Sequence, residues 1–246
     1  MNLQRRLAAE GVGTALLLAA VVGSGIMGER LAGGNVAIAL LANAIATGST
    51  LVAIILTFGP ISGAHFNPAV TIADASQRGL SWRDVPFYIT AQLIGAVVGV
   101  LAAHLMFGDQ LFQLSQHVRA GGAQLFSEFV ATFGLLAVIW GCSRARSESV
   151  PLAVGLYITG AYWFTASTSF ANPAVTAARA LTNTFAGIRP ADGPGFIAAQ
   201  LAGALVATLF FRWLIPVSMP HADAVVVPRE GISERHEEAS AHSLHR

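Results

Sequence analysis

Long apolar segments recur along the sequence, and six of them have the length that a bilayer-spanning helix needs. They cover residues 7–28, 35–58, 85–107, 125–142, 151–170 and 195–216. A helix needs about 20 apolar residues to cross the roughly 30 Å of hydrocarbon in a bilayer. The pattern therefore predicts an all-α membrane protein with six transmembrane helices over residues 1–216. The polar and charged residues 217–246 predict a disordered cytoplasmic tail.

Two shorter apolar stretches, residues 69–75 and 174–182, lie between these segments. Each begins just after an Asn-Pro dipeptide, at Asn67 and at Asn172. Proline in the first turn is typical of a helix start. Because neither stretch is long enough to cross the membrane, we predict two re-entrant half-helices in addition to the six spans.

The two halves of the chain, about residues 1–110 and 120–216, repeat one another. Three landmarks occur in the same order in both halves: Glu-x-x-x-Thr (10–14 and 128–132), Asn-Pro-Ala-Val-Thr (67–71 and 172–176) and Gln-x-x-Gly-Ala (92–96 and 200–204). Because each half has three spans, the second half must enter the membrane from the opposite side, which makes an inverted repeat. The half-helices then meet near the midplane, where irregular backbone is tolerated only if protein buries it or it lines a water-filled path.

The composition excludes several classes of protein. Hydrophobic residues make up 54% of the chain and charged residues only 11%, against about 25% charged in soluble domains. This composition argues against a soluble enzyme, a nucleic-acid-binding protein and a disordered protein. The predicted loops on the N-terminal side hold seven arginines and those on the other side hold four. This bias predicts that both termini are cytoplasmic.

The paired Asn-Pro-Ala motifs, the segment SGAHFNPAVT (residues 62–71) and the Glu and Gln landmarks resemble the aquaporin and aquaglyceroporin family, also called the major intrinsic proteins. The resemblance covers about residues 5–216. It implies a passive channel for small uncharged solutes and water, surrounded by lipid, in a homotetramer with one pore per subunit. It implies no catalytic residue, metal or cofactor. The motif residues implied at the pore are Asn67, Pro68, Ala69, Asn172, Pro173 and Ala174.

The motifs have a physical use at the midplane. A helix N-terminus carries about half a positive charge, so two of them facing each other repel a cation. Asn67 and Asn172 can cap their half-helices and still present an amide donor to a solute. The family implies that loop carbonyls before each motif line the path, at Gly63, Ala64, His65, Phe170 and Ala171. The side chain of His65 either faces the pore or anchors its loop.

Two acidic residues, Glu10 and Glu128, lie inside predicted spans. An ionisable group in a membrane is expensive, and by default it indicates a functional site such as a proton relay. The resemblance implies a structural role instead, in which each carboxylate accepts hydrogen bonds from backbone amides of the re-entrant loops.

The family's spacing, counted from Asn67 and Asn172, places the narrowest part of the pore at Thr47, Gly160, Ser169 and Val175. Most family members have arginine where this chain has Val175. None of the four is aromatic or charged, so we expect a wide selectivity filter. Arg179, one turn after Val175, either moves the positive charge to the outer mouth, or packs against loops or snorkels to the outer interface.

Filters without this arginine resemble a bacterial subgroup associated with arsenic resistance, whose members pass trivalent arsenic acids and methylated arsenicals. This resemblance implies a location in a bacterial inner membrane and metalloid or glycerol-like solutes. A water-selective aquaporin is an alternative. A secondary transporter is another, because inverted repeats with broken helices also describe that class.

Overall fold

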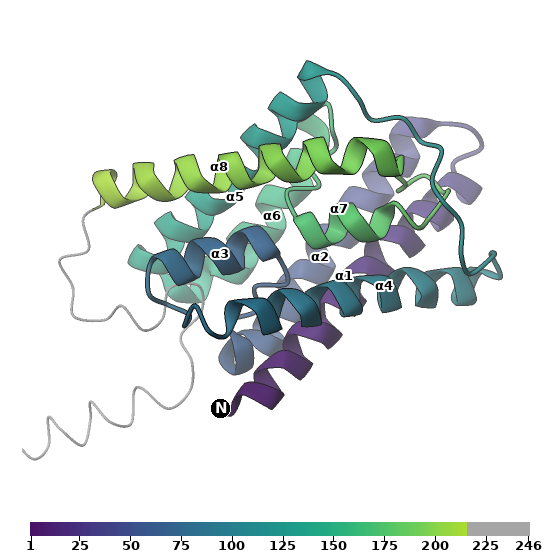
Figure 1. Ribbon diagram of the computed structural model, residues 1–246. Helices are drawn as coiled ribbons and strands as arrows, with labels where there is room; N and C mark the ends of the chain where they lie inside the picture. The colour runs from purple at the N-terminus through teal and green to yellow at the C-terminus, as the bar shows by residue number, and fades with distance from the viewer. Residues whose placement is uncertain (216–246) are drawn as a thin grey trace, which may run out of the picture.

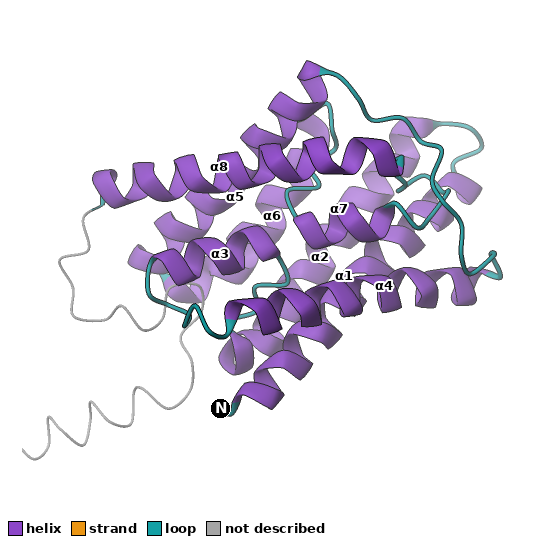
Figure 2. Cartoon of the chain, viewed as in Figure 1, coloured by secondary structure: helices purple, strands orange, loops and turns teal. Residues whose placement is uncertain are grey.

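The computed structural model describes residues 1–215, and these form eight α-helices without any strand (Figures 1 and 2). Residue 216 and the predicted tail, 217–246, lie outside the described residues. The helices are α1 (Leu3–Leu31), α2 (Val36–Ser62), α3 (Pro68–Ser76), α4 (Val85–Phe107), α5 (Gly122–Ala145), α6 (Val150–Phe164), α7 (Pro173–Arg179) and α8 (Gly193–Leu214). Two short 3-10 helices, Ser147–Ser149 and Pro190–Asp192, precede α6 and α8.

Five of these helices, α1, α2, α4, α5 and α8, are long and apolar enough to cross a membrane. The sixth predicted span, 151–170, is wrong in its second part. Helix α6 has 15 residues, or about 22 Å at 1.5 Å per residue. It ends at Phe164 because Thr165 adopts an extended conformation, from which the chain turns toward the second Asn-Pro.

The inverted repeat is visible in the packing. Helix α1 packs against α2 and α4, and α5 packs in the same way against α6 and α8, while α2 and α6 join the two halves. The half-helices α3 and α7 lie end to end between α4 and α8, with their N-terminal ends facing each other (Figure 1). The predicted all-helical, aquaporin-like architecture is confirmed.

The glycines of the two Gln-x-x-Gly-Ala landmarks explain why that motif recurs. A Cβ on Gly95 would clash with the backbone of Gly11 in α1, and a Cβ on Gly203 would clash with the carbonyl of Phe129 in α5. Small residues let membrane helices approach closely. The landmark thus marks a close helix contact in each half, α1 with α4 and α5 with α8.

The outward faces of the long helices are apolar. Leu105, Leu156 and Leu205 are 68%, 62% and 59% exposed. Such surfaces are rare on soluble monomers, whereas a bilayer makes them favourable because lipid tails cover them. The polar side chains of Glu10, Glu128 and the two motif asparagines are buried inside the bundle instead.

Candidate pore between the two half-helices

The two half-helices begin with nearly identical backbone geometry. Asn67 and Asn172 are the N-cap residues, with φ/ψ of −156°/118° and −157°/115°. Their side-chain oxygens accept hydrogen bonds from the backbone amides of Ala69 and Ala174, each at 2.9 Å. Proline follows each cap, where its missing N–H leaves no bond unmade. Each motif therefore starts a helix at the centre of the protein.

The residues before each cap have left-handed backbone conformations at matching places. The residue directly before the asparagine has a φ of 48° in both halves, Phe66 and Ala171, and the residue three before it has a φ of 51°, Ala64 and Ser169. Positive φ in non-glycine residues is strained and gathers at functional sites. Here it turns the backbone so that each loop can enter the centre and reverse into a helix.

The two asparagines tie the half-helices together. Asn67 Nδ2 donates to the carbonyl of Ala171 at 2.8 Å, and Asn172 Nδ2 donates to the carbonyl of Phe66 at 2.7 Å. An amide nitrogen carries two N–H donors, so one remains on each side chain after the bond to the opposite loop. Both residues also line the central cavity. Capping and presentation of a donor to the cavity occur together.

The buried carboxylates hold these loops. Glu10 accepts hydrogen bonds from the backbone amides of His65 (2.9 Å) and Phe66 (2.8 Å), and from the side chains of Ser62 (2.6 Å) and Gln92 (2.8 Å). In the second half, Glu128 accepts bonds from the amides of Phe170 and Ala171, each at 2.9 Å, and from Gln200 at 2.6 Å. This geometry is that of the anchoring role, since the donors are fixed backbone and amide groups.

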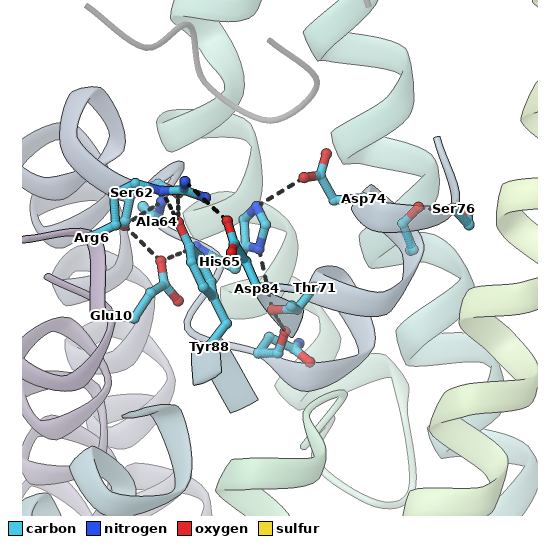
Figure 3. A network of polar contacts seen from close by, with 12 residues as sticks. Arg6, Glu10, Ser62, Ala64, His65, Thr71, Asp74, Ser76, Asp84 and Tyr88 are labelled. Atoms are coloured by element: carbon cyan, nitrogen blue, oxygen red, sulfur yellow. Dashed lines mark hydrogen bonds and ion pairs between the residues drawn. The ribbon is translucent and has the colours of Figure 1, made fainter. Parts of the chain in front are cut away.

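His65 shows both of the features that the sequence left open. Its ring nitrogens contact Thr71 Oγ1 at 3.2 Å and Asp74 Oδ2 at 3.4 Å, and the ring of Tyr88 lies 5.5 Å away (Figure 3). The side chain is therefore held in the protein, as the anchoring alternative requires. The residue also lines the cavity.

The residues around His65 form a polar network at the N-terminal side of the bundle (Figure 3). Arg6 donates to the hydroxyl of Tyr88 at 2.7 Å and to Asp84 at 3.3 Å, and Tyr88 donates to the carbonyl of Ser62 at 2.9 Å. The network joins α1, the end of α2 and the start of α4. It fixes the entry point of the first re-entrant loop.

A narrow cavity of about 60 Å³ runs past the junction of the half-helices, which is room for a few water molecules. The re-entrant loops and half-helices contribute the polar residues His65, Asn67, Ser169, Asn172 and Arg179 to its lining, beside apolar residues such as Phe66, Val70 and Val175. Helices α1, α2, α5 and α6 contribute mostly aliphatic side chains, with Thr47 and Tyr162 as the polar exceptions. The aliphatic residues are Leu17, Val21, Leu51, Ile55, Leu135, Ile139, Val150, Val154 and Ile158.

Most of the predicted loop residues border this cavity. Ala64, His65, Phe170 and Ala171 line it. Gly63, which caps the C-terminal end of α2 with a φ of 92°, does not. The prolines and alanines of the two motifs, Pro68, Ala69, Pro173 and Ala174, are buried and shape the helix starts without lining the cavity.

Three of the four predicted filter residues line the cavity, and the fourth does not. Thr47, Ser169 and Val175 line the cavity, but Gly160 is exposed, and a Cβ there would meet no atom within 4 Å. Tyr162 takes its place, with its hydroxyl 3.2 Å from Thr47 Oγ1. An aromatic residue thus lines the cavity beside Thr47, where the sequence predicted none.

The spacing of α6 explains this correction. Val150, Val154, Ile158 and Tyr162 recur every four residues and all line the cavity, because residues four apart share a helix face. Gly160 lies two residues from that register and points away. This four-residue spacing, readable in the sequence, would have identified Tyr162.

Arg179 is buried at the end of α7 and lines the cavity. Its Nε donates to the carbonyl of Ala186, and its guanidinium carbon lies 3.4 Å from the centroid of the Phe170 ring. It does not snorkel to the interface. Arg179 both packs against the loops and lines the cavity, which the sequence analysis gave as alternatives.

Comparisons with known proteins agree with this geometry. The family model described as "Major intrinsic protein" matches residues 1–169 and 143–239. Aquaglyceroporin AqpS of Rhizobium meliloti (strain 1021) is 54% identical over 219 residues, which are 89% of this chain and 94% of AqpS. Aquaporin NIP3-1 of Oryza sativa subsp. japonica is 34% identical over 65% of this chain, which spans 52% of that relative's length.

A solved structure has the same fold. The aquaglyceroporin from Plasmodium falciparum superposes with a TM-score of 0.68, covering 90% of this chain and 99% of its own, at 21% sequence identity. The family match, the identity to AqpS and the paired half-helices lead to one assignment. The chain belongs to the major intrinsic protein family of membrane channels and is not an enzyme.

Proposed function

We propose that this channel passes uncharged solutes that carry hydroxyl groups on an apolar body, such as glycerol-like molecules and trivalent or methylated arsenicals, together with water. The observation that carries the proposal is the mixed lining of the cavity, with polar groups from the re-entrant loops, the two asparagines and Arg179, and aliphatic side chains from α1, α2, α5 and α6. Hydroxyl groups can bond to the polar groups while the solute's apolar side contacts the aliphatic side chains.

Val175 supports solutes larger than water. It lines the central cavity with a short apolar side chain, so it neither donates to a solute nor extends far into the cavity. The name of the relative AqpS, aquaglyceroporin, agrees with this substrate class. One observation favours the alternative, a water-selective channel: Tyr162 brings an aromatic ring to the constriction beside Thr47.

The test is stopped-flow light scattering on proteoliposomes with water, glycerol, urea and arsenous acid, without any ion gradient. We expect faster equilibration of the neutral solutes than in empty liposomes. Acceleration of water alone, with empty-liposome rates for every other solute, would establish the alternative, and no acceleration of any solute would reject the proposed function. Flux that saturates and needs an ion gradient would indicate a transporter.

A pair of variants connects the flux to the constriction. Ser169→Leu fills a position that lines the cavity, so we expect at least a several-fold loss of solute flux. Gly160→Ala is the matched control, since a methyl group there meets no atom within 4 Å. Equal flux in both variants would show that the cavity is not the path.

We also propose a bacterial inner-membrane location with both termini cytoplasmic, and a homotetramer with one pore per subunit. The excess of arginine in the loops on the N-terminal side supports the orientation, and the apolar outer faces of the helices agree with contact to lipid and neighbouring subunits. Labelling of cysteines introduced at residues 34 and 2 from each side of intact cells tests the first point. Mass measurement of the solubilised protein tests the second.

A further inference from the structure

We propose that Arg179 is a specificity-determining residue of the pore, which supplies the positive charge and hydrogen-bond donors that Val175 cannot supply. The inference rests on the proposed channel function and deepens it. It explains how a filter without an arginine at position 175 can still exclude cations and bind hydroxyl groups.

The position of Arg179 on α7 is the first support. Val175 and Arg179 are four residues apart and therefore share a face of the helix, and both line the central cavity. The side chain of Arg179 starts one helical turn further from the asparagines than a side chain at position 175 does. The charge is thus moved along the path and is not lost from it.

The free donors of Arg179 are the second support. A guanidinium has five N–H donors, and only Nε–H has an acceptor within residues 1–215, the carbonyl of Ala186. The residue is only 2% exposed, and a buried charge without hydrogen-bond partners is costly. Water or a solute oxygen in the cavity can accept from the two Nη groups, which makes this a binding point on the path.

The surroundings of Arg179 hold it in place. Its guanidinium stacks on the ring of Phe170 at 3.4 Å, a cation–π contact that favours the charged form. The amide of Phe170 is bound to Glu128 at 2.9 Å, and Phe196 lies edge-on to its ring at 5.3 Å. The donor group therefore rests on the same re-entrant loop that lines the pore.

A second arginine near this ring has a different task. Arg119 lies 5.1 Å from the Phe170 centroid, but its guanidinium donates to the carbonyls of Gly187 (2.8 Å), Ser167 (3.3 Å) and Phe185 (3.4 Å). It does not line the cavity. Arg119 therefore holds the loops together through these hydrogen bonds. Arg179 is the arginine beside Phe170 that faces a solute in the cavity.

The decisive comparison is between Arg179→Gln and Arg189→Gln. Arg189 is the matched control because it lies in the loop after α7, is 41% exposed at its side chain and pairs with Asp192 at 2.8 Å. In proteoliposomes we expect Arg179→Gln to raise the ratio of cation leak to glycerol flux about tenfold, and Arg189→Gln to leave it unchanged. A folded Arg179→Gln protein with the wild-type ratio would overturn the inference.

A rescue experiment separates the charge from general damage to the fold. The double variant Val175→Arg with Arg179→Gln keeps the net charge and moves the guanidinium back by one turn. We expect cation exclusion to return while flux of bulky solutes falls. The glycerol flux of the unmodified protein, measured in the same experiment, tests the proposed function by itself. The proposed function and the inference about Arg179 can therefore fail separately.

A measurement with Arg179 intact covers the case in which its variants do not fold. Val175→Cys combined with Cys142→Ser leaves a single thiol, since Cys142 is the sole native cysteine. The quantity measured is the ratio of two reaction rates, that of cationic aminoethyl methanethiosulfonate to that of the neutral methyl reagent. We expect this ratio to be at least tenfold lower at the introduced thiol than for free cysteine. An equal ratio, or no reaction with the neutral reagent, contradicts the inference.

Discussion

Replacing Glu10 by glutamine isolates the part that a buried carboxylate plays in holding a re-entrant loop. Glu10 Oε1 accepts from Ser62 and from the amide of His65, and Oε2 accepts from the amide of Phe66 and from Gln92. A glutamine offers one oxygen and one NH₂ group. Its NH₂ group would replace a carboxylate oxygen that accepts two hydrogen bonds, and those two donors would then face another donor.

The size of the effect follows from these contacts. The side-chain oxygen of Gln92 is buried without a partner, so Gln92 can rotate its amide and accept from the new NH₂ group. The amide of Phe66 has no such remedy and loses its acceptor. An unsatisfied buried donor costs about 1–3 kcal/mol, and bonds to a charged group contribute about 1.5–3 kcal/mol each. Glu10→Gln should lower the free energy of unfolding by about 3 kcal/mol.

The assay is SDS-induced unfolding in mixed micelles, combined with solute flux in proteoliposomes. Glu29→Gln is the matched control, because Glu29 lies on the same helix but is exposed. We expect a lower unfolding midpoint and reduced flux for Glu10→Gln, and wild-type values for the control. If Glu10→Gln matched the control in stability while losing only a pH-dependent flux, the carboxylate would be a proton relay and the anchoring argument would be wrong.

Three further changes test the pore and the packing. Val175→Arg should lower the ratio of bulky-solute to water permeability, because the guanidinium enters the constriction beside Tyr162; an unchanged ratio would remove Val175 from the filter. Asn67→Asp replaces an amide donor by a carboxylate that the helix N-terminus tolerates, so measurable cation conductance is expected in the folded variant, and unchanged selectivity would mean that Asn67 only caps. Gly95→Ala places a methyl group against the backbone of Gly11 and should destabilise the protein by about 1–3 kcal/mol, as SDS unfolding would measure; wild-type stability would show that α1 and α4 can separate at low cost.

The fold was predictable because its determinants are local and repeated. Apolar length defines the spans, and the Asn-Pro dipeptides define the half-helices. The odd number of spans in each half then forces the inversion. The Glu and Gln landmarks were readable for a related reason, since a buried polar group needs a partner and the equivalent residue occurs in both halves.

The filter was only partly predictable because it depends on where α6 ends. Counting twelve residues back from Asn172 gives Gly160, which assumes a fixed loop length between helix and motif. In the structure α6 ends at Phe164 and the intervening loop sets the register. The face of α6 that meets the cavity therefore carries Tyr162. Helix periodicity is the safer rule here, because it follows from geometry and not from loop length.

The direction of Arg179 could not be derived from sequence, because it depends on two loops. Its Nε bond reaches Ala186 and its guanidinium stacks on Phe170, and neither contact has a local signal. The charge alone was compatible with snorkelling to the interface. The three-dimensional approach of the loops is what directs the side chain along the path.

The inverted repeat carries this reasoning one step further. Arg179 is seven residues after Asn172, and its equivalent, seven residues after Asn67, is Asp74. Each contacts the residue two before its own asparagine: Arg179 stacks on Phe170, and Asp74 meets His65 at 3.4 Å.

The same backbone thus places a buried base in the cavity lining of the second half and a buried acid, paired with His65 outside that lining, in the first. The C-terminal end of a helix carries a partial negative charge, which favours a cation and opposes an anion. The dipole of α7 therefore stabilises Arg179, whereas Asp74 near the end of α3 needs the ring of His65. The two halves therefore share one architecture but carry opposite charges at equivalent positions, and only the positive one lines the cavity.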